Sequence, residues 1–138
     1  MADCCATETK LIYACSGAAD VGEIADQVAR KLRSEGFAKM TCLAGIGAGL
    51  SGYVQSAKGA DENITIDGCP VACAKTTLEK IGVTPTSYTL TDMGLIKGET
   101  PITEKIIAQM CEKIKNASGK TDPPVQIATG GCSCGGKC

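Results

Sequence analysis

Histidine and tryptophan are both absent from this chain of 138 residues. Without histidine, the chain lacks the most frequent general base and a principal zinc ligand. Any acid–base chemistry must therefore use Asp, Glu, Lys, Tyr or Cys. Aromatic residues make up only 3% of the chain, which argues against a platform on which nucleic-acid bases stack.

A strong excess of charge is also missing. There are 14 basic and 15 acidic residues, for a net charge of −1, so we expect neither a nucleic-acid surface nor an anionic-membrane binder. No apolar run approaches the ~20 residues of a membrane span. The first residues show neither the basic region nor the apolar stretch of a signal peptide. These features predict a cytoplasmic protein.

Cysteine, in contrast, occurs ten times. In a small secreted protein, this number would suggest a disulfide scaffold. In the cytoplasm thiols stay reduced, and clustered cysteines more often indicate metal binding or redox chemistry. A chain of this length can also bury a core without disulfides, so we favour metal or redox chemistry.

The hydrophobic pattern predicts strands that alternate with helices. Expected strands cover residues 10–15, 37–42, 63–67 and 87–92. Expected helices begin with Asp20 as N-cap, with Pro70 and with Pro101, and end near residues 36, 82 and 119. The glycine-rich residues 43–52 are expected to form a loop that leads into a short helix over 51–59. An edge strand is expected at 125–128.

Alternating strands and helices predict an α/β fold with three layers. We expect a mostly parallel sheet of about four strands in the order 2-1-3-4, with flanking helices. The predicted organisation is a flexible N-terminus (1–9), a single α/β domain (10–119) and a flexible tail rich in Pro, Gly and Cys (120–138).

Three of the predicted strands have a cysteine at their end. Cys15 and Cys42 are the last residues of two of them, Cys69 follows the third, and Cys73 lies four residues after Cys69. Neighbouring strands are ~4.8 Å apart, and Zn–S bonds of ~2.3 Å place tetrahedral ligands a little under ~4 Å from one another. Side chains can lean that far inward, so the pattern predicts a zinc site of four cysteines where ligand sites form in parallel sheets.

The segments around these cysteines resemble the DGC family of zinc-binding proteins. The resemblance rests on YACSG at 13–17, MTCLAGIG at 40–47 and IDGCPVACAK at 66–75, and it extends over roughly residues 10–115. The triplet for which the family is named is Asp67-Gly68-Cys69. The resemblance implies that Cys15, Cys42, Cys69 and Cys73 bind zinc, and it implies little about biochemical role.

The remaining cysteines have other expected roles. Cys111 lies at an apolar position of the last helix and is expected in the core. Cys4 and Cys5 belong to the flexible N-terminus. Three cysteines near the C-terminus are separated by glycine and serine and could form a second, flexible chelator for Zn or Cu(I): Cys132, Cys134 and Cys138.

Several functions remain open at this stage. The zinc site could belong to a metal carrier or sensor. Cys69 and Cys73 could instead form a redox pair, or act as the nucleophile of a thiol-dependent enzyme. Four cysteines also suit an iron–sulfur cluster. A GxGxxG pattern at 47–52 fits nucleotide binding only weakly, because a lone fingerprint gives many false positives. Whether the protein is an enzyme stays undecided.

Overall fold

A computed structural model describes residues 8–119 of the chain. Two sets of predictions lie outside these residues: the flexible ends with the edge strand at 125–128, and the terminal cysteines. Those cysteines are Cys4, Cys5, Cys132, Cys134 and Cys138. In the described part, no helix is long and apolar enough to cross a membrane.

The centre of the fold is a parallel sheet of four strands in the order β2-β1-β3-β4. In chain order the strands are β1 (Lys10–Ala14), β2 (Lys39–Met40), β3 (Glu62–Asp67) and β4 (Thr86–Thr89). Ile12 is in register with Met40 on one side and Ile64 on the other. The α/β class, the parallel pairing and the order 2-1-3-4 predicted from the sequence are confirmed.

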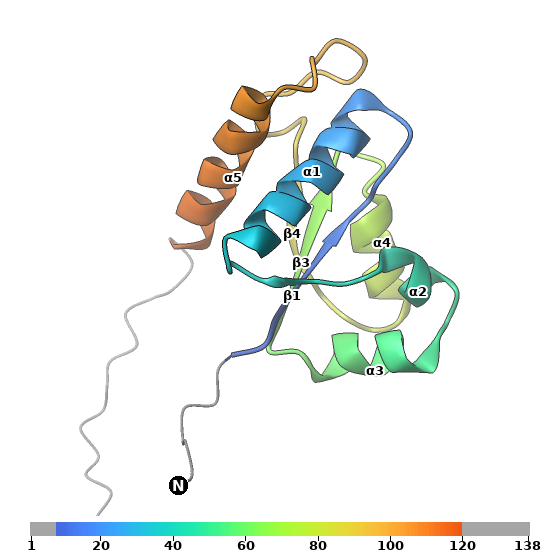
Figure 1. The fold of residues 1–138 in the computed structure, drawn as a ribbon. Coiled ribbons are helices and arrows are strands. Elements are labelled where there is room, and N and C mark those ends of the chain that lie inside the picture. The colour runs from blue at the N-terminus through green and yellow to red at the C-terminus, as the bar shows by residue number, and fades with distance from the viewer. Residues whose placement is uncertain (1–7, 120–138) are drawn as a thin grey trace, which may run out of the picture.

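Helices cover both faces of this sheet (Figure 1). α1 (Asp20–Ser34) and α5 (Glu104–Ser118) pack side by side on one face. The other face carries α2 (Leu43–Gly47), α3 (Ser51–Gly59) and α4 (Cys73–Lys80). The side chains of β1 alternate accordingly: Ile12 and Ala14 join the core under α1 and α5, whereas Leu11 and Tyr13 join the core on the opposite face.

The second strand is shorter than predicted. The first residue expected in this strand, Phe37, donates its backbone N–H to the end of α1 instead. Gly36 has the left-handed φ of 78° that ends α1, and the Phe37 N–H donates back to the Leu32 carbonyl. This is the pairing of a Schellman motif. Phe37 therefore closes the helix, and the ladder begins only at Lys39.

The glycine-rich segment after β2 is partly helical, so the predicted loop at 43–52 is wrong over its first half. In α2, Ile46 is buried in the core. Gly45 lies against the ring of Tyr53, whose nearest atoms would be 2.7 Å from a Cβ at that position. Gly45 therefore allows close packing between α2 and α3 and does not mark irregular structure. The GxGxxG pattern accordingly joins two short helices, and it lacks the strand–turn–helix setting of a nucleotide site.

Three helix starts also differ from the prediction. α4 begins at Cys73 rather than at Pro70, after a turn in which the Ala72 N–H donates to the Cys69 carbonyl. α1 has Ala19 at its N-cap, and Asp20 is already its first helical residue. α5 starts after Thr103, whose side chain accepts from the Ile106 N–H. Its end at Gly119 agrees with the prediction.

A candidate thiol site at the carboxyl edge of the sheet

Three adjacent strands are each followed by a cysteine. Cys15 comes directly after β1, whereas Cys42 and Cys69 come two residues after β2 and β3. Since the strands are parallel and adjacent, all three residues lie at the same edge of the sheet. Cys73 is the first residue of α4, the helix that follows β3. The structure therefore brings the four predicted ligands to one end of the fold.

These thiols are not gathered around a single point. All four are free; Cys15 and Cys69 are half-buried, whereas Cys42 and Cys73 are exposed. Among residues 8–119, no three or more His, Cys, Asp or Glu side chains lie close enough together to hold a metal ion. The chemistry of four thiols suits zinc, but their placement does not form a closed site. Zinc binding would require the side chains to move toward one another.

The sulfur of Cys15 has a well-defined environment. Its Sγ accepts a hydrogen bond from the Gly68 N–H at 3.4 Å, which connects the end of β1 to the end of β3. The next residue, Ser16, has a left-handed φ of 48°, and its hydroxyl donates to Asp26 on α1 at 3.0 Å.

Asp67, the first residue of the Asp67-Gly68-Cys69 triplet, binds the start of the helix that follows it. The Asp67 carboxylate is buried and accepts from the Ala74 N–H at 2.8 Å and the Lys75 N–H at 3.1 Å. It therefore satisfies two free amides in the first turn of α4, although it lies on a strand rather than at the N-cap. The carboxylate also complements the helix dipole.

Gly68 is required by a close contact between backbones. A Cβ at this position would lie 2.6 Å from the Val21 carbonyl carbon. Gly22, the next residue of α1, is just as close to the loop after β1, with 2.5 Å between its hypothetical Cβ and the Gly17 oxygen. The first turn of α1 thus rests directly on the two loops that carry Cys15 and Cys69.

Backbone strain is concentrated beside the cysteines. Within the described residues, only Ser16 and Ala72 are non-glycine residues with positive φ, at 48° and 51°. Ser16 follows Cys15, and Ala72 precedes Cys73. Such conformations cost on the order of 1–3 kcal/mol and cluster at functional sites. Their positions support a functional role for this edge of the sheet.

Lys97 is a part of the site that sequence reasoning missed. Its Nζ lies 3.7 Å from Cys69 Sγ, although the two residues are 28 positions apart. Lys97 belongs to the loop between β4 and α5, which passes close to the start of α1 (Figure 1). This loop has no hydrophobic periodicity, so no signal in the sequence pointed to the contact.

A pocket of about 790 Å³ opens beside Cys15 and Cys42. Arg30 and Arg33 of α1 line it together with Tyr53 of α3. Arg30 is paired with Asp26, Nε to Oδ2 2.6 Å. Cys15 and Cys42 line this pocket, whereas Cys69 and Cys73 are not among its lining residues.

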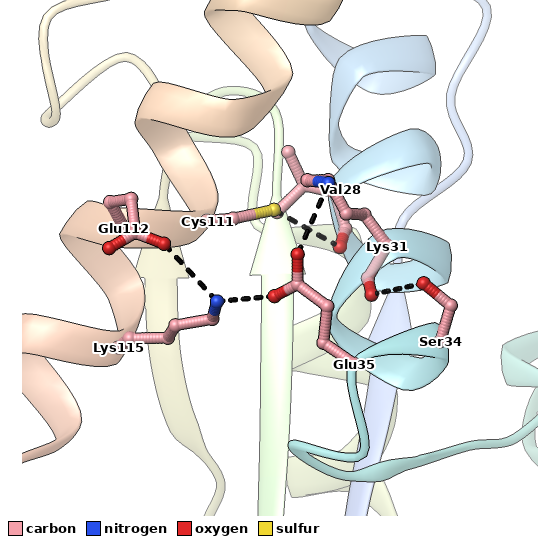
Figure 2. A network of polar contacts seen from close by, with 7 residues as sticks. All are labelled: Val28, Lys31, Ser34, Glu35, Cys111, Glu112 and Lys115. Carbon is pink, nitrogen blue, oxygen red and sulfur yellow. Dashed lines mark hydrogen bonds and ion pairs between the residues drawn. The ribbon is translucent and has the colours of Figure 1, made fainter.

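Cys111 is separate from the site, as predicted. It is fully buried between α5 and α1, and its thiol donates to the Val28 carbonyl at 3.7 Å (Figure 2). Burial raises the pKa of this thiol to about 11, and the nearby Glu35 adds to the shift. Figure 2 also shows Glu35 accepting from Lys31 and Lys115, which links the two helices at the surface. Cys111 is a core residue with no access to the carboxyl edge.

The fold and the thiol edge together define an α/β protein with cysteines at the ends of three adjacent parallel strands. The chain belongs to the DGC family, because the model of the DGC domain matches residues 11–114. Over 88 residues it is 38% identical to the anaerobic and virulence modulator AnvM of Pseudomonas aeruginosa. This aligned region makes up 63% of this chain and 67% of AnvM. No solved structure matches the chain.

Proposed function

We propose that the protein binds one zinc ion through Cys15, Cys42, Cys69 and Cys73, and that it acts as a metal carrier or sensor. The observation that carries the proposal is the presence of a cysteine at the end of each of three adjacent parallel strands. The strained residues beside Cys15 and Cys73 add support. Soft thiolates are the preferred ligands of zinc where histidine is absent.

A carrier or sensor fits the geometry better than a closed structural site. Cys42 and Cys73 are exposed, so water and competing ligands can reach them. Because the four thiols are not gathered in the structure, metal binding would change the arrangement of the loops that carry them. Binding would then be coupled to conformation and to release of thiol protons. Such a site can exchange its metal, and it can report whether the metal is bound.

The electrostatics of the edge also fit a thiolate site. Four thiolates and Zn²⁺ carry a formal charge of −2, which needs compensating donors. The Gly68 N–H at Cys15 and the Lys97 ammonium at Cys69 are two such donors already in place. Hydrogen bonds of this kind orient metal ligands and adjust their affinity. The role in a reducing cytoplasm, with a metal ion as the partner rather than nucleic acid or membrane, is part of the same proposal.

Elemental mass spectrometry on anaerobically purified full-length protein tests the proposal. We expect one zinc per chain in the wild type, and loss of zinc in Cys69→Ser and Cys73→Ser together with a lower melting temperature. The matched control replaces Cys132, Cys134 and Cys138 by serine and should keep the zinc. Loss of zinc in this control would move the chelation to the tail, and zinc-free wild type grown with ample zinc would reject the proposal.

The rate of exchange separates a carrier or sensor from a structural site. A carrier should pass its zinc to a colorimetric chelator within minutes, whereas a closed structural site should retain it. The absorption spectrum of the same anaerobic preparation tests for an iron–sulfur cluster, because a cluster would colour the protein brown.

Lys97 also favours a second candidate, a thiol-dependent redox protein or enzyme. Its ammonium lies 3.7 Å from the Cys69 sulfur, and reactive cysteines are found in partly exposed surroundings beside cations. The structure places Cys73, rather than Cys69, in the first turn of α4. Mild oxidation followed by peptide mass mapping distinguishes this function, because a redox pair would form a Cys69–Cys73 disulfide that dithiothreitol reverses.

A further inference from the structure

The loop between β4 and α5 is attached to the thiol site at two points. Lys97 reaches Cys69, and Gly98 and Thr100 are bound to Asp20 at the start of α1. The Gly98 N–H lies 2.9 Å from Asp20 Oδ1 and 3.0 Å from Asp20 Oδ2, and the Thr100 N–H donates to Oδ2 at 3.0 Å. A single carboxylate thus holds the backbone on the C-terminal side of Lys97.

The loop is also ordered internally around Lys97. The Ile96 N–H donates to the Thr100 hydroxyl at 2.9 Å, and that hydroxyl donates to the Ile96 carbonyl at 2.7 Å. On the N-terminal side of Lys97, the Met93 carbonyl accepts from Lys113 of α5 at 2.7 Å. Residues 96–100 therefore form a closed turn, and Asp20 fixes this turn relative to α1.

The position of α1 relates this turn to Cys69. The first turn of α1 lies against Gly68, the residue before Cys69, at backbone contact distance. Asp20 begins that helix, so the carboxylate that binds the loop stands on the same element that supports Cys69. The backbone of the Lys97 loop and the backbone beside Cys69 are consequently both held by α1, and the Lys97 side chain spans the remaining distance to the Cys69 sulfur.

We propose that Lys97 is the charge partner of Cys69 and that Asp20 positions it there by binding the Gly98 and Thr100 amides. The proposal rests partly on the zinc function, because it assigns Lys97 the task of offsetting negative charge on a metal-bound Cys69. The contact between Lys97 and Cys69 is present without a bound metal. Loss of such outer partners typically lowers metal affinity roughly 10- to 100-fold.

The first test measures zinc transfer from full-length variants to a colorimetric chelator. Lys97→Gln should release zinc roughly tenfold faster than the wild type, and Lys97→Arg should restore most of the retention because the cation remains. Lys75→Gln is the matched control: it removes a lysine two residues from Cys73 whose ammonium is near Glu79 rather than a sulfur. Equal rates for Lys97→Gln and Lys75→Gln would overturn the proposal.

The second test detects the contact in zinc-free protein. Succinimidyl iodoacetate, a short amine-to-thiol cross-linker, should give a Lys97–Cys69 peptide pair in mass spectrometry. The yield of that pair should fall severalfold in Asp20→Ala and less in Asp20→Asn, with circular dichroism showing that both variants are folded. Absence of the pair in the wild type, or an equal yield in Asp20→Ala, would refute the positioning.

The two tests separate this inference from the proposed function. If the wild type binds no zinc, the zinc function fails, and the cross-link with its dependence on Asp20 still decides whether Lys97 is held at Cys69. If zinc binds but Lys97→Gln releases it at the rate of the wild type, the zinc function stands and the role of Lys97 is wrong.

Discussion

The amide of Gly68 donates a hydrogen bond to the sulfur of Cys15, with 3.4 Å between nitrogen and Sγ. The bond joins the loops that leave two neighbouring strands, 53 residues apart in the sequence. Gly68 immediately precedes Cys69, so the position of one predicted ligand depends on the other. The middle residue of the Asp-Gly-Cys triplet thus organises the site through its backbone.

Replacing Gly68 by alanine should damage both the fold and the site. The new Cβ would lie 2.6 Å from the Val21 carbonyl carbon, and backbone atoms cannot yield as a flexible side chain can. We expect Gly68→Ala to lower the free energy of unfolding by about 1–3 kcal/mol, the usual cost of overpacking. Urea unfolding followed by circular dichroism measures this change.

Gly52 provides the control for that substitution. It lies inside α3, and a Cβ there would meet no atom within 4 Å. Gly52→Ala should therefore stabilise the protein by about 0.5–1 kcal/mol, because alanine loses less conformational freedom in a helix. Equal stability of the two variants would show that the close approach of Gly68 to α1 is incorrect.

Asp67 should contribute to stability rather than bind metal directly. Its buried carboxylate accepts from the Ala74 and Lys75 amides at the start of α4. Asp67→Ala leaves these amides without their partner, and we expect a loss of about 1.5–3 kcal/mol in the free energy of unfolding. Asp92→Ala, at an exposed position, should change stability by no more than about 0.5 kcal/mol. A stable Asp67→Ala variant would contradict the capping role.

The arrangement of the sheet could be predicted because its information is local. Apolar runs on β1 and β3 and intervening amphipathic helices indicate parallel strands. The order 2-1-3-4 has a switch point at β1, which places the three strand ends that carry cysteines next to one another. The position of the cysteines at the strand ends follows from the same pattern. Whether the thiols approach to coordination distance depends on side-chain and loop geometry, which the pattern does not contain.

Other features depend on packing contacts and hydrogen bonds between separate elements. Gly45 looked like a loop residue, although it allows the Tyr53 ring to pack on α2. Asp20 looked like an N-cap, although its carboxylate binds amides 78 and 80 residues away. A single sequence carries no local sign of either contact, so the helix α2 and the Lys97 loop emerged only from the structure.

Acid should weaken the attachment of the Lys97 loop. Hydrogen bonds from Gly98, with smaller contributions from Val21 and Thr100, lower the pKa of Asp20 below its ordinary value. The unfolded chain therefore binds this proton at higher pH than the folded chain. The stabilisation is complete above the ordinary pKa of about 4 and is lost as the pH falls through the lower folded value.

Urea titrations between pH 7 and pH 2.5 measure this contribution. Asp20→Asn should reduce the loss of stability between about pH 4 and the acid limit, because the group that titrates has been removed. Glu35, whose pKa is lowered mainly by Lys115, also contributes in this range, so Glu35→Gln is measured in parallel. An Asp20→Asn profile parallel to that of the wild type would show that the loop is not held by the charged carboxylate.

Alkali should act on the protein through Cys111. Burial raises the pKa of this thiol to about 11, whereas an unfolded cysteine titrates near about 8.5. Below the unfolded value the stabilisation is complete, and it is lost as the pH rises toward the folded value, because only the unfolded chain releases the proton. Urea titrations from pH 8 to pH 10 should show stability falling with pH, and less steeply in Cys111→Ala.

In the native wild type at pH 8, iodoacetamide should modify the exposed Cys42 and Cys73 and leave Cys111 intact until urea unfolds the chain. Early modification of Cys111 would mean that the α1–α5 interface opens in the native state.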